Sequence, residues 1–413
     1  MKQFLRNISI SRILVAALII RLVLIPLAFH SDLTTNTIWG IYAEEFGLKG
    51  YYDWLNFGNY ARPEYPPIST ILFLAVRGLW LRLFDVIWFV NVKIPAFPSN
   101  LMTWYDTLGN QALLKLPGII SDIGIGYLIY KYTKKVKYAV FYLFNPAVIY
   151  LSSVWGQTES FVAFFGLLGI IKFLEKKYYS GFWSLFVSFL TKASLLPSFP
   201  VILIQAVKEK MKLKEIVMLA VFALAGVFLV GSIFTDGSAV TWMIESYRTK
   251  FMVGPFNLPY INLNAFNFWG LILGLDRISD KTEFLGIAYS LWAWIIAGSF
   301  FAVILNKFRD KKTNIFFALT LVFTASFLFL PRMHERYLFP AFVFFPILVA
   351  KFPKLARAFV LLSAVFLINL YHWWWIPAIP PLMAFFDLEL VVRGLSAVNL
   401  SVFGYLLWKY QLS

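Results

Sequence analysis

Long apolar runs alternate with short charged segments along almost the whole chain. The first run spans 13–29, and comparable runs follow up to the C-terminus. A helix needs about 20 mostly apolar residues to cross a bilayer, so runs of this length predict membrane-spanning helices. Because no small-residue cleavage site ends the first run and many runs follow it, we expect a retained helix and not a signal peptide. The pattern predicts an all-α, multi-pass membrane protein.

Composition agrees with this pattern. Of the 413 residues, 60% are hydrophobic and 14% are charged, whereas a soluble domain carries about 25% charged residues. The apolar residues, about 248 of them, suffice for about eleven to thirteen spans of roughly 20 residues. We therefore expect 1–413 to form a single integral-membrane domain. The chain has no cysteine and three histidines, which excludes disulfides and cysteine-bound metals and leaves little for a histidine-rich metal site.

The chain carries a formal net charge of +16. In a soluble protein this excess of cations would suggest a nucleic acid partner. In a membrane protein the cytoplasmic loops collect Lys and Arg, and the lipid head groups that they meet are anionic. We therefore expect contacts with membrane lipids and no nucleic acid partner.

Charge also predicts the orientation of the chain. Three cations, Lys2, Arg6 and Arg12, precede the first run and place the N-terminus in the cytoplasm of a multi-pass cell-membrane protein. The segment 30–67 after this run holds five acidic and two basic residues, so we expect it on the extracytoplasmic side. A loop of this length is often functional.

Later charges divide the rest of the chain. The basic clusters at 307–312 and 351–357 should be cytoplasmic, and two apolar runs lie between them. The charged joint 332–336 connects these two runs and therefore lies outside, on the side of the first loop. The resulting parts are 30–67, a first outer loop that carries short helices; 68–234, a helical module; 235–283, a second outer loop; and 284–413, the C-terminal helices.

Two stretches conflict with a simple assignment. If 68–90 crosses inward and 112–130 crosses outward, the four lysines within 131–137 lie outside, against the charge rule. The stretch 180–206 is broken at Lys192, which predicts two short passages or a re-entrant hairpin with the lysine paired inside the bundle.

The joint Arg332-Met333-His334-Glu335-Arg336 holds four ionisable groups in five positions. A charge at membrane depth costs roughly 2.5–3.5 kcal/mol, so such groups are functional candidates. If the joint is helical, Arg332 and Arg336 share a face, and paired guanidinium groups bind phosphate oxygens in a bidentate manner. Glu335 can then orient one arginine. The alternative is an interfacial turn whose arginines reach out to solvent.

Carboxylates and an aromatic group occupy the same outer side. Asp32 follows the first run and is a candidate general base, although the residue taken alone favours an ordinary helix-end carboxylate. Glu64 supplies a second carboxylate before the next apolar run. Trp155 and Gln157 offer a stacking surface and a hydrogen-bonding amide to a sugar, although Trp155 alone is typical of an interface anchor.

Several short motifs occur in a fixed order along the chain: Asp32, Tyr65-Pro66-Pro67, Asn145-Pro146, Trp155-Gly156-Gln157, Asn264-Ala265-Phe266-Asn267-Phe268-Trp269 and His334-Glu335-Arg336. This order resembles the GT-C superfamily of integral-membrane glycosyltransferases. The nearer relatives would be the GPI-type mannosyltransferases and their prokaryotic homologues. The endoplasmic-reticulum glucosyltransferases that extend lipid-linked oligosaccharides are similar too, since they carry Tyr-Pro-Pro and a His-Glu-Lys motif.

The resemblance implies an inverting transfer of a hexose from a polyprenyl-phosphate donor to a glycan, glycolipid or protein acceptor at the extracytoplasmic face. Asp32 then corresponds to the catalytic carboxylate, and His334 and Arg336, with Arg332 beside them, to the donor-phosphate site. The expected sugar- or acceptor-binding residues are Glu64, Tyr65, Trp155, Gln157, Asn264 and Glu335. Some relatives use a metal held by an Asp-x-Asp pair; here position 30 is His30, so we expect no metal and no other cofactor. Arg336 replaces the lysine of the glucosyltransferase motif, and either side chain binds phosphate.

Two other classes of protein compete with this interpretation. A secondary transporter or lipid flippase needs charged groups near the bilayer midplane and often has repeated halves, whereas the charged clusters here fall at the ends of apolar runs and no repeat is visible. A non-catalytic membrane scaffold gives no reason for an acidic outer loop opposite an arginine-rich joint. The sequence therefore favours a polyprenyl-phosphate-sugar-dependent glycosyltransferase, similar to mannosyl- or glucosyltransferases.

Overall fold

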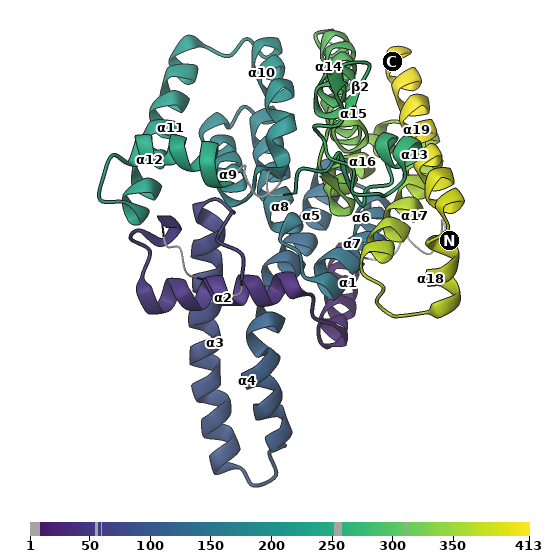
Figure 1. Cartoon of the computed structure of the whole chain (residues 1–413). Coiled ribbons are helices and arrows are strands. Elements are labelled where there is room, and N and C mark those ends of the chain that lie inside the picture. Colours follow the sequence, from purple (N-terminus) through teal and green to yellow (C-terminus); the bar gives the residue numbers. More distant parts are fainter. Residues whose placement is uncertain (1–8, 54–56, 59, 252–257, 311) are drawn as a thin grey trace.

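Helices account for nearly all of the structure, a computed structural model that describes residues 9–53, 57–58, 60–251, 258–310 and 312–413 (Figure 1). The strands are limited to two pairs of two-residue segments among these residues. The protein is therefore an all-α, multi-pass membrane protein, as the hydrophobic pattern predicts.

The N-terminal half contains the first outer loop and the helical module. Its helices are α1 (Ile10–Leu24), η2 (Ile25–Leu27), α2 (Ser31–Phe46), η3 (Tyr51–Asp53), α3 (Pro67–Lys93), α4 (Ser99–Leu114), α5 (Leu116–Thr133), α6 (Val136–Leu143), α7 (Pro146–Ile149), η4 (Tyr150–Trp155), α8 (Glu159–Leu174), α9 (Tyr178–Thr191), η5 (Ala193–Ser198), α10 (Phe199–Lys208) and α11 (Leu213–Phe234). The first loop carries α2 and η3, in agreement with the expected short helices.

The C-terminal half contains the second outer loop and the last helices. Its elements are α12 (Ala239–Ser246), η6 (Tyr247–Phe251), β1 (Asn262–Leu263), α13 (Phe268–Leu273), β2 (Glu283–Phe284), β3 (Ile287–Ala288), α14 (Tyr289–Phe308), α15 (Ile315–Phe329), β4 (Met333–His334), η8 (Glu335–Leu338), α16 (Phe339–Lys351), η9 (Pro353–Leu355), α17 (Ala356–Trp373), α18 (Pro380–Phe386) and α19 (Glu389–Gln411).

Within the described residues, six helices are long and apolar enough to cross a membrane, or seven if the bent pair α6 and α7–η4 forms one span. This is fewer than the eleven to thirteen expected. The composition argument assigned every apolar residue to a full-length span, whereas many lie in shorter helices such as Ala193–Lys208 and Ile315–Phe329.

The conflict at 68–137 disappears because α3 is not an inward crossing. In Figure 1, α3 and α4 form a hairpin that extends away from the helical body beyond α2. Trp80 and Tyr105 hold this hairpin together, since each donates a side-chain hydrogen bond to the other's carbonyl, at 3.2 and 3.0 Å. Helix α3 is also not among the described helices that are long and apolar enough to cross a membrane, so the assumed inward crossing of 68–90 finds no support, and the chain leaves and returns at one end of the bundle.

α5 then runs antiparallel to α1. Arg21 near the end of α1 pairs at 3.0 Å with Asp122 near the start of α5, and both side chains are fully buried. The lysines of 131–137 therefore lie at the same end of the bundle as Arg12, as the charge rule requires. Which end faces the cytoplasm stays a prediction. The stretch 180–206 forms α9, η5 and α10, with Lys192 at the break between α9 and η5. Both expected arrangements, two short passages and a re-entrant hairpin, stay predictions.

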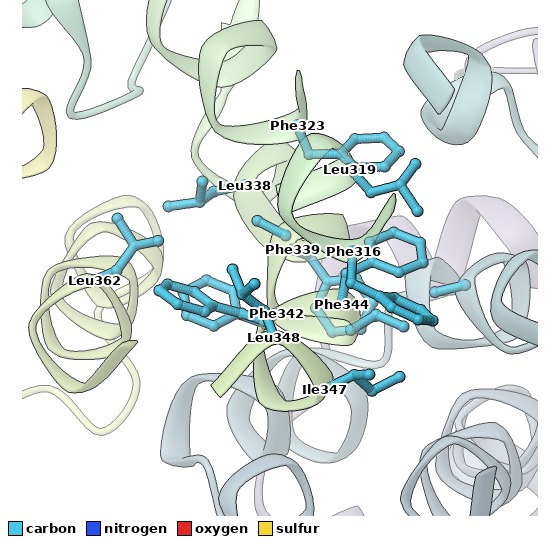
Figure 2. Packing of buried hydrophobic residues seen from close by; sticks show 14 of the residues in the cluster. Phe316, Leu319, Phe323, Leu338, Phe339, Phe342, Phe344, Ile347, Leu348 and Leu362 are labelled. Atoms are coloured by element: carbon cyan, nitrogen blue, oxygen red, sulfur yellow. The ribbon is translucent and has the colours of Figure 1, made fainter. Parts of the chain in front are cut away.

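The deepest core surrounds α15 and α16, which are buried on every face, as expected for helices that are apolar all round. Figure 2 shows their phenylalanines and leucines interdigitating, with Leu362 of α17 closing one side. Phe342 stacks on Phe366 with ring centroids 4.9 Å apart. This rigid pair of helices carries the charged joint 332–336 between its two ends, and the joint is therefore held on a fixed scaffold.

Candidate active site

Asp32 lies in the first turn of α2, directly after the break that follows α1 and η2. The His30 ring caps the helix, because its Nδ1 accepts a hydrogen bond from the Asp32 backbone N–H at 3.0 Å. Gln157 Nε2 donates to Asp32 Oδ2 at 2.5 Å. Gly156, at a φ of +89°, ends η4 and turns the chain so that Gln157 reaches this carboxylate. The structure thus joins two motifs that lie 125 residues apart in the sequence.

Arg336 belongs to η8, and it forms a cluster of charged groups with Glu335, Glu159 and Asp32. Its guanidinium bonds Glu335 at 2.8 Å and lies 3.8 Å from Glu159 at the start of α8. It also lies over the Trp155 ring, 5.8 Å from the centroid. Asp32 and Arg336 are near enough for the charge of each to shift the pKa of the other. The predicted base and the predicted phosphate-binding cation therefore share one site.

Two residues that the sequence argument did not assign to the site complete it. Lys192, at the break between α9 and η5, pairs at 2.5 Å with Glu159, and both side chains are buried. The Lys192 ammonium also lies 4.8 Å from the centre of the Tyr65 ring. Glu64, next to Tyr65, is influenced electrostatically by Lys192, Arg336 and Asp32. The position of Lys192 inside an apolar stretch was a signal for a paired cation, but nothing in the sequence indicated its partner.

Burial and neighbouring charges set the protonation of this cluster. Burial raises the pKa of Asp32, but the contact with His30 and the positive charge of Arg336 outweigh it, so that the pKa is held well below its usual range. Burial raises the pKa of Glu64, against the opposing effects of Lys192 and Arg336. Burial lowers the pKa of His334. At neutral pH the site thus holds an ionised Asp32 and a neutral His334.

Aromatic rings form one wall beside Asp32. His30 lies with its ring centroid 4.8 Å from Trp155 and 5.0 Å from Trp374, and the two tryptophans are 5.8 Å apart. Trp155 is fully buried in this stack. The tryptophan therefore shapes the wall in this structure, and it offers no open face on which a sugar ring can stack.

Several buried polar atoms of the cluster have no hydrogen-bond partner among the described residues. They are Trp155 Nε1, Glu159 Oε2, His334 Nδ1, Glu335 Oε2 and Arg336 Nε. Buried polar atoms are nearly always hydrogen-bonded in proteins, and exceptions often mark a place where a ligand or water binds. Five such atoms within one cluster indicate a binding site with both donors and acceptors.

Arg332 takes a different place from the one predicted. The joint is not helical: Arg332 has a φ of +60°, Met333–His334 is strand β4, and η8 begins only at Glu335. Arg332 instead holds Asp280, with Nε donating at 2.6 Å. The prediction that Arg332 and Arg336 share a helix face is therefore wrong, because β1 pairs with β4 in parallel and keeps this segment extended.

Asn264 contacts the backbone of the joint 332–336 at His334. It forms a β-bridge with His334 and has a φ of +65°. Its side-chain oxygen contacts His372 Nδ1 at 3.1 Å, and its carbonyl accepts a 2.7 Å hydrogen bond from Asn369. The predicted asparagine-rich segment therefore fixes the backbone that carries His334.

No group of three or more His, Cys, Asp and Glu side chains that could hold a metal ion is found among the described residues. No protein-family model and no curated protein matches the sequence. The resemblance drawn from the motifs thus depends on their order and on the geometry of this cluster.

Proposed function

We propose that the protein is an inverting glycosyltransferase of the GT-C type that moves a hexose from a polyprenyl-phosphate carrier to an acceptor hydroxyl. The observation that supports this most is the meeting of an ionised, partly exposed Asp32 with a largely buried Arg336 in a multi-pass membrane protein. Base and cation are the two groups that displacement of a lipid phosphate requires.

In this reaction the acceptor oxygen attacks the anomeric carbon on the face opposite the phosphate. The bond between that carbon and the phosphate oxygen breaks, its electron pair stays with the phosphate, and the configuration inverts. The hydroxyl proton passes to Asp32, a step that typically contributes about 10²–10⁴-fold. Arg336, with an Nε that lacks a hydrogen-bond partner among the described residues, stabilises the charge that develops on the departing phosphate.

The low pKa of Asp32 fits this order of events. A carboxylate with a depressed pKa is a weak base, and part of the depression comes from the charge of Arg336. A phosphate bound to Arg336 offsets that charge, so the pKa of Asp32 rises when the donor is present. Proton abstraction is thereby favoured only after the donor has bound.

The other residues have supporting roles in the proposal. Lys192 adds a second cation near the phosphate, and neutral His334 donates a hydrogen bond without adding charge. The carboxylates of Glu159 and Glu335, each with an oxygen that lacks a hydrogen bond among the described residues, accept from sugar hydroxyls. Glu64, whose pKa burial raises, lies close enough to Asp32 for their charges to interact, and in the proposal it binds the acceptor.

The direct test is conversion of donor by the purified full chain in detergent. Polyprenyl-phosphate mannose and polyprenyl-phosphate glucose are offered separately with glycan, glycolipid and peptide acceptors, and free polyprenyl phosphate is measured by mass spectrometry. We expect one of the donors to be consumed only when an acceptor is present. If neither donor is consumed, but a labelled lipid crosses liposome membranes that contain the protein, the alternative of a flippase or transporter replaces this proposal.

A further inference from the structure

Lys115 occupies an unusual position between α4 and α5. Its side chain is fully buried, and no ion pair to a carboxylate is found for it among the described residues. Its ammonium, which has three N–H groups, instead lies within hydrogen-bond distance of four backbone carbonyls, so that one N–H is shared between two of them: Ile25 at 2.9 Å, Ala28 at 2.6 Å, Ser153 at 3.0 Å and Val154 at 2.9 Å. An ammonium surrounded by carbonyl oxygens in this way resembles a bound metal cation in its contacts.

The four carbonyls belong to two segments that lead directly to the site. Ile25 and Ala28 lie in the break after α1, and the chain continues from there to His30 and Asp32. Because the last carbonyls of a helix have no partner within it and carry partial negative charge, this end of α1 and η2 attracts a cation.

The second pair of carbonyls lies at the end of η4. Ser153 and Val154 precede Trp155, and the chain reaches Gln157 two residues later. Lys115 therefore bridges the segment that carries the proposed base and the segment that carries the amide bonded to it.

Packing around the Lys115 stem is equally close. A Cβ added to Gly156 would lie 2.9 Å from Lys115 Cγ and 2.9 Å from the Leu33 methyl groups. The ammonium also lies 4.7 Å from the centre of the Phe29 ring. Only glycine fits at position 156, so the turn before Gln157 packs directly against the aliphatic part of the Lys115 side chain.

We infer that Lys115 is a positioning residue whose ammonium fixes the two backbone segments so that Asp32 and Gln157 meet. Its importance for turnover rests on the proposed function, but its effect on the order of the two segments does not. Loss of the ammonium leaves four carbonyls without their donor, and the segments then separate to reach other partners. The Gln157 amide no longer holds the Asp32 carboxylate.

The first experiment measures the order of the α2 start without any activity. The chain has no cysteine, so Ser31→Cys, at an exposed position beside Asp32, can carry a single spin label. We expect Lys115→Met to increase the mobility of this label in the electron paramagnetic resonance spectrum. The milder Lys115→Gln keeps two N–H donors and should give a smaller increase. If Lys115→Met does not fold, the spectrum of Lys115→Gln is compared with that of the wild type instead.

A matched control is available at Lys208. Its ammonium also donates to backbone carbonyls, those of Phe308, Asp310 and Thr313, at 3.0, 3.0 and 3.3 Å. Those carbonyls lie at the end of α14 and in the segment between α14 and α15, and none of them belongs to a segment that carries Asp32 or Gln157. We therefore expect Lys208→Met and Lys208→Gln to leave the label at position 31 unchanged. A folded Lys115→Gln variant with the wild-type spectrum would overturn the inference.

The second experiment separates positioning from a mere loss of folded protein. The hydrogen bond from Gln157 contributes to the low pKa of Asp32, so its loss raises that pKa and moves the acid limb of kcat/KM toward higher pH. A smaller folded fraction lowers the rate equally at every pH and leaves this limb in place. An unmoved limb in Lys115→Gln would contradict positioning. If the wild type transfers no sugar, the proposed function fails, while the spin-label result still decides the role of Lys115.

Discussion

Replacing Asp32 by Asn tests the proposed chemistry with the smallest possible change in shape. Asn keeps a side-chain oxygen in place to accept the 2.5 Å hydrogen bond from Gln157. The His30 cap is retained as well, because it uses the backbone N–H of residue 32. We therefore expect Asp32→Asn to fold with a melting temperature close to that of the wild type.

The expected loss is specific to turnover. An amide cannot take the hydroxyl proton, so kcat should fall by about 10²–10⁴-fold, the usual contribution of a general base. Donor binding should not weaken, because the substitution removes a negative charge whose attraction for Arg336 competes with that of the phosphate. A fall in kcat without a loss of donor affinity is what distinguishes a general base from a residue that binds the donor.

The assay combines initial rates of polyprenyl phosphate release with a donor titration on the same protein. Asp53→Asn is the matched control, since Asp53 is an exposed carboxylate of the same loop that pairs only with Lys250 among the described residues. It should retain wild-type kinetics. Turnover by Asp32→Asn within threefold of the wild type, at every donor concentration, would refute the assignment of Asp32 as base.

The remaining predictions concern the cations, the histidine and the metal. Arg336→Ala should weaken donor binding more than acceptor binding, and equal effects in the two titrations would contradict its contact with phosphate. Arg332→Met should instead lower stability by about 3–5 kcal/mol, because it leaves the buried Asp280 without its cation; denaturant unfolding measures this, and donor affinity should not change. Burial lowers the pKa of His334, so the unfolded chain binds more protons and the fold loses stability as the pH falls below the ordinary histidine pKa; His334→Gln should reduce the drop in melting temperature between pH 7 and pH 5. Chelation should leave transfer intact, and a loss restored by Mn²⁺ or Mg²⁺ would reverse that expectation.

The sequence predicts Asp32 and the joint 332–336 on one side of the membrane because each lies at the end of an apolar run, and the structure places Asp32 and Arg336 in one cluster. The charge rule assigns such ends to one side of a membrane. Residues at the same end of a single helix bundle are then expected to lie close together. The argument needed no knowledge of helix packing. It could not give distances, and it gave no reason why Gln157 and not Trp155 would be the residue that contacts the carboxylate.

Errors arose where tertiary contacts override local pattern. The 27-residue helix α3 has enough apolar residues to suggest a span, yet it forms a protruding hairpin with α4 through the paired contacts of Trp80 and Tyr105. A span would bring Arg77 and Arg82 into hydrocarbon, and this cost was the available signal. The spacing of Arg332 and Arg336 by one turn suggests a helix for the joint 332–336, but strand pairing with residues 71 positions earlier prevents a helix there.

Lys115 and Lys192 show why the remainder of the site was beyond sequence reasoning. Both lysines lie in apolar stretches of the sequence. The sequence alone therefore predicts for each a buried cation with a binding partner, and it does not distinguish between them. The structure gives Lys192 the carboxylate of Glu159 and Lys115 four carbonyls. A carboxylate partner can at least be sought among the acidic residues of the sequence. Carbonyls occur at every position, and they become a cation site only where helix ends converge. A cation that only backbone carbonyls bind can therefore be recognised only once the fold is known. Its contacts then show how the segments that carry the proposed site pack together.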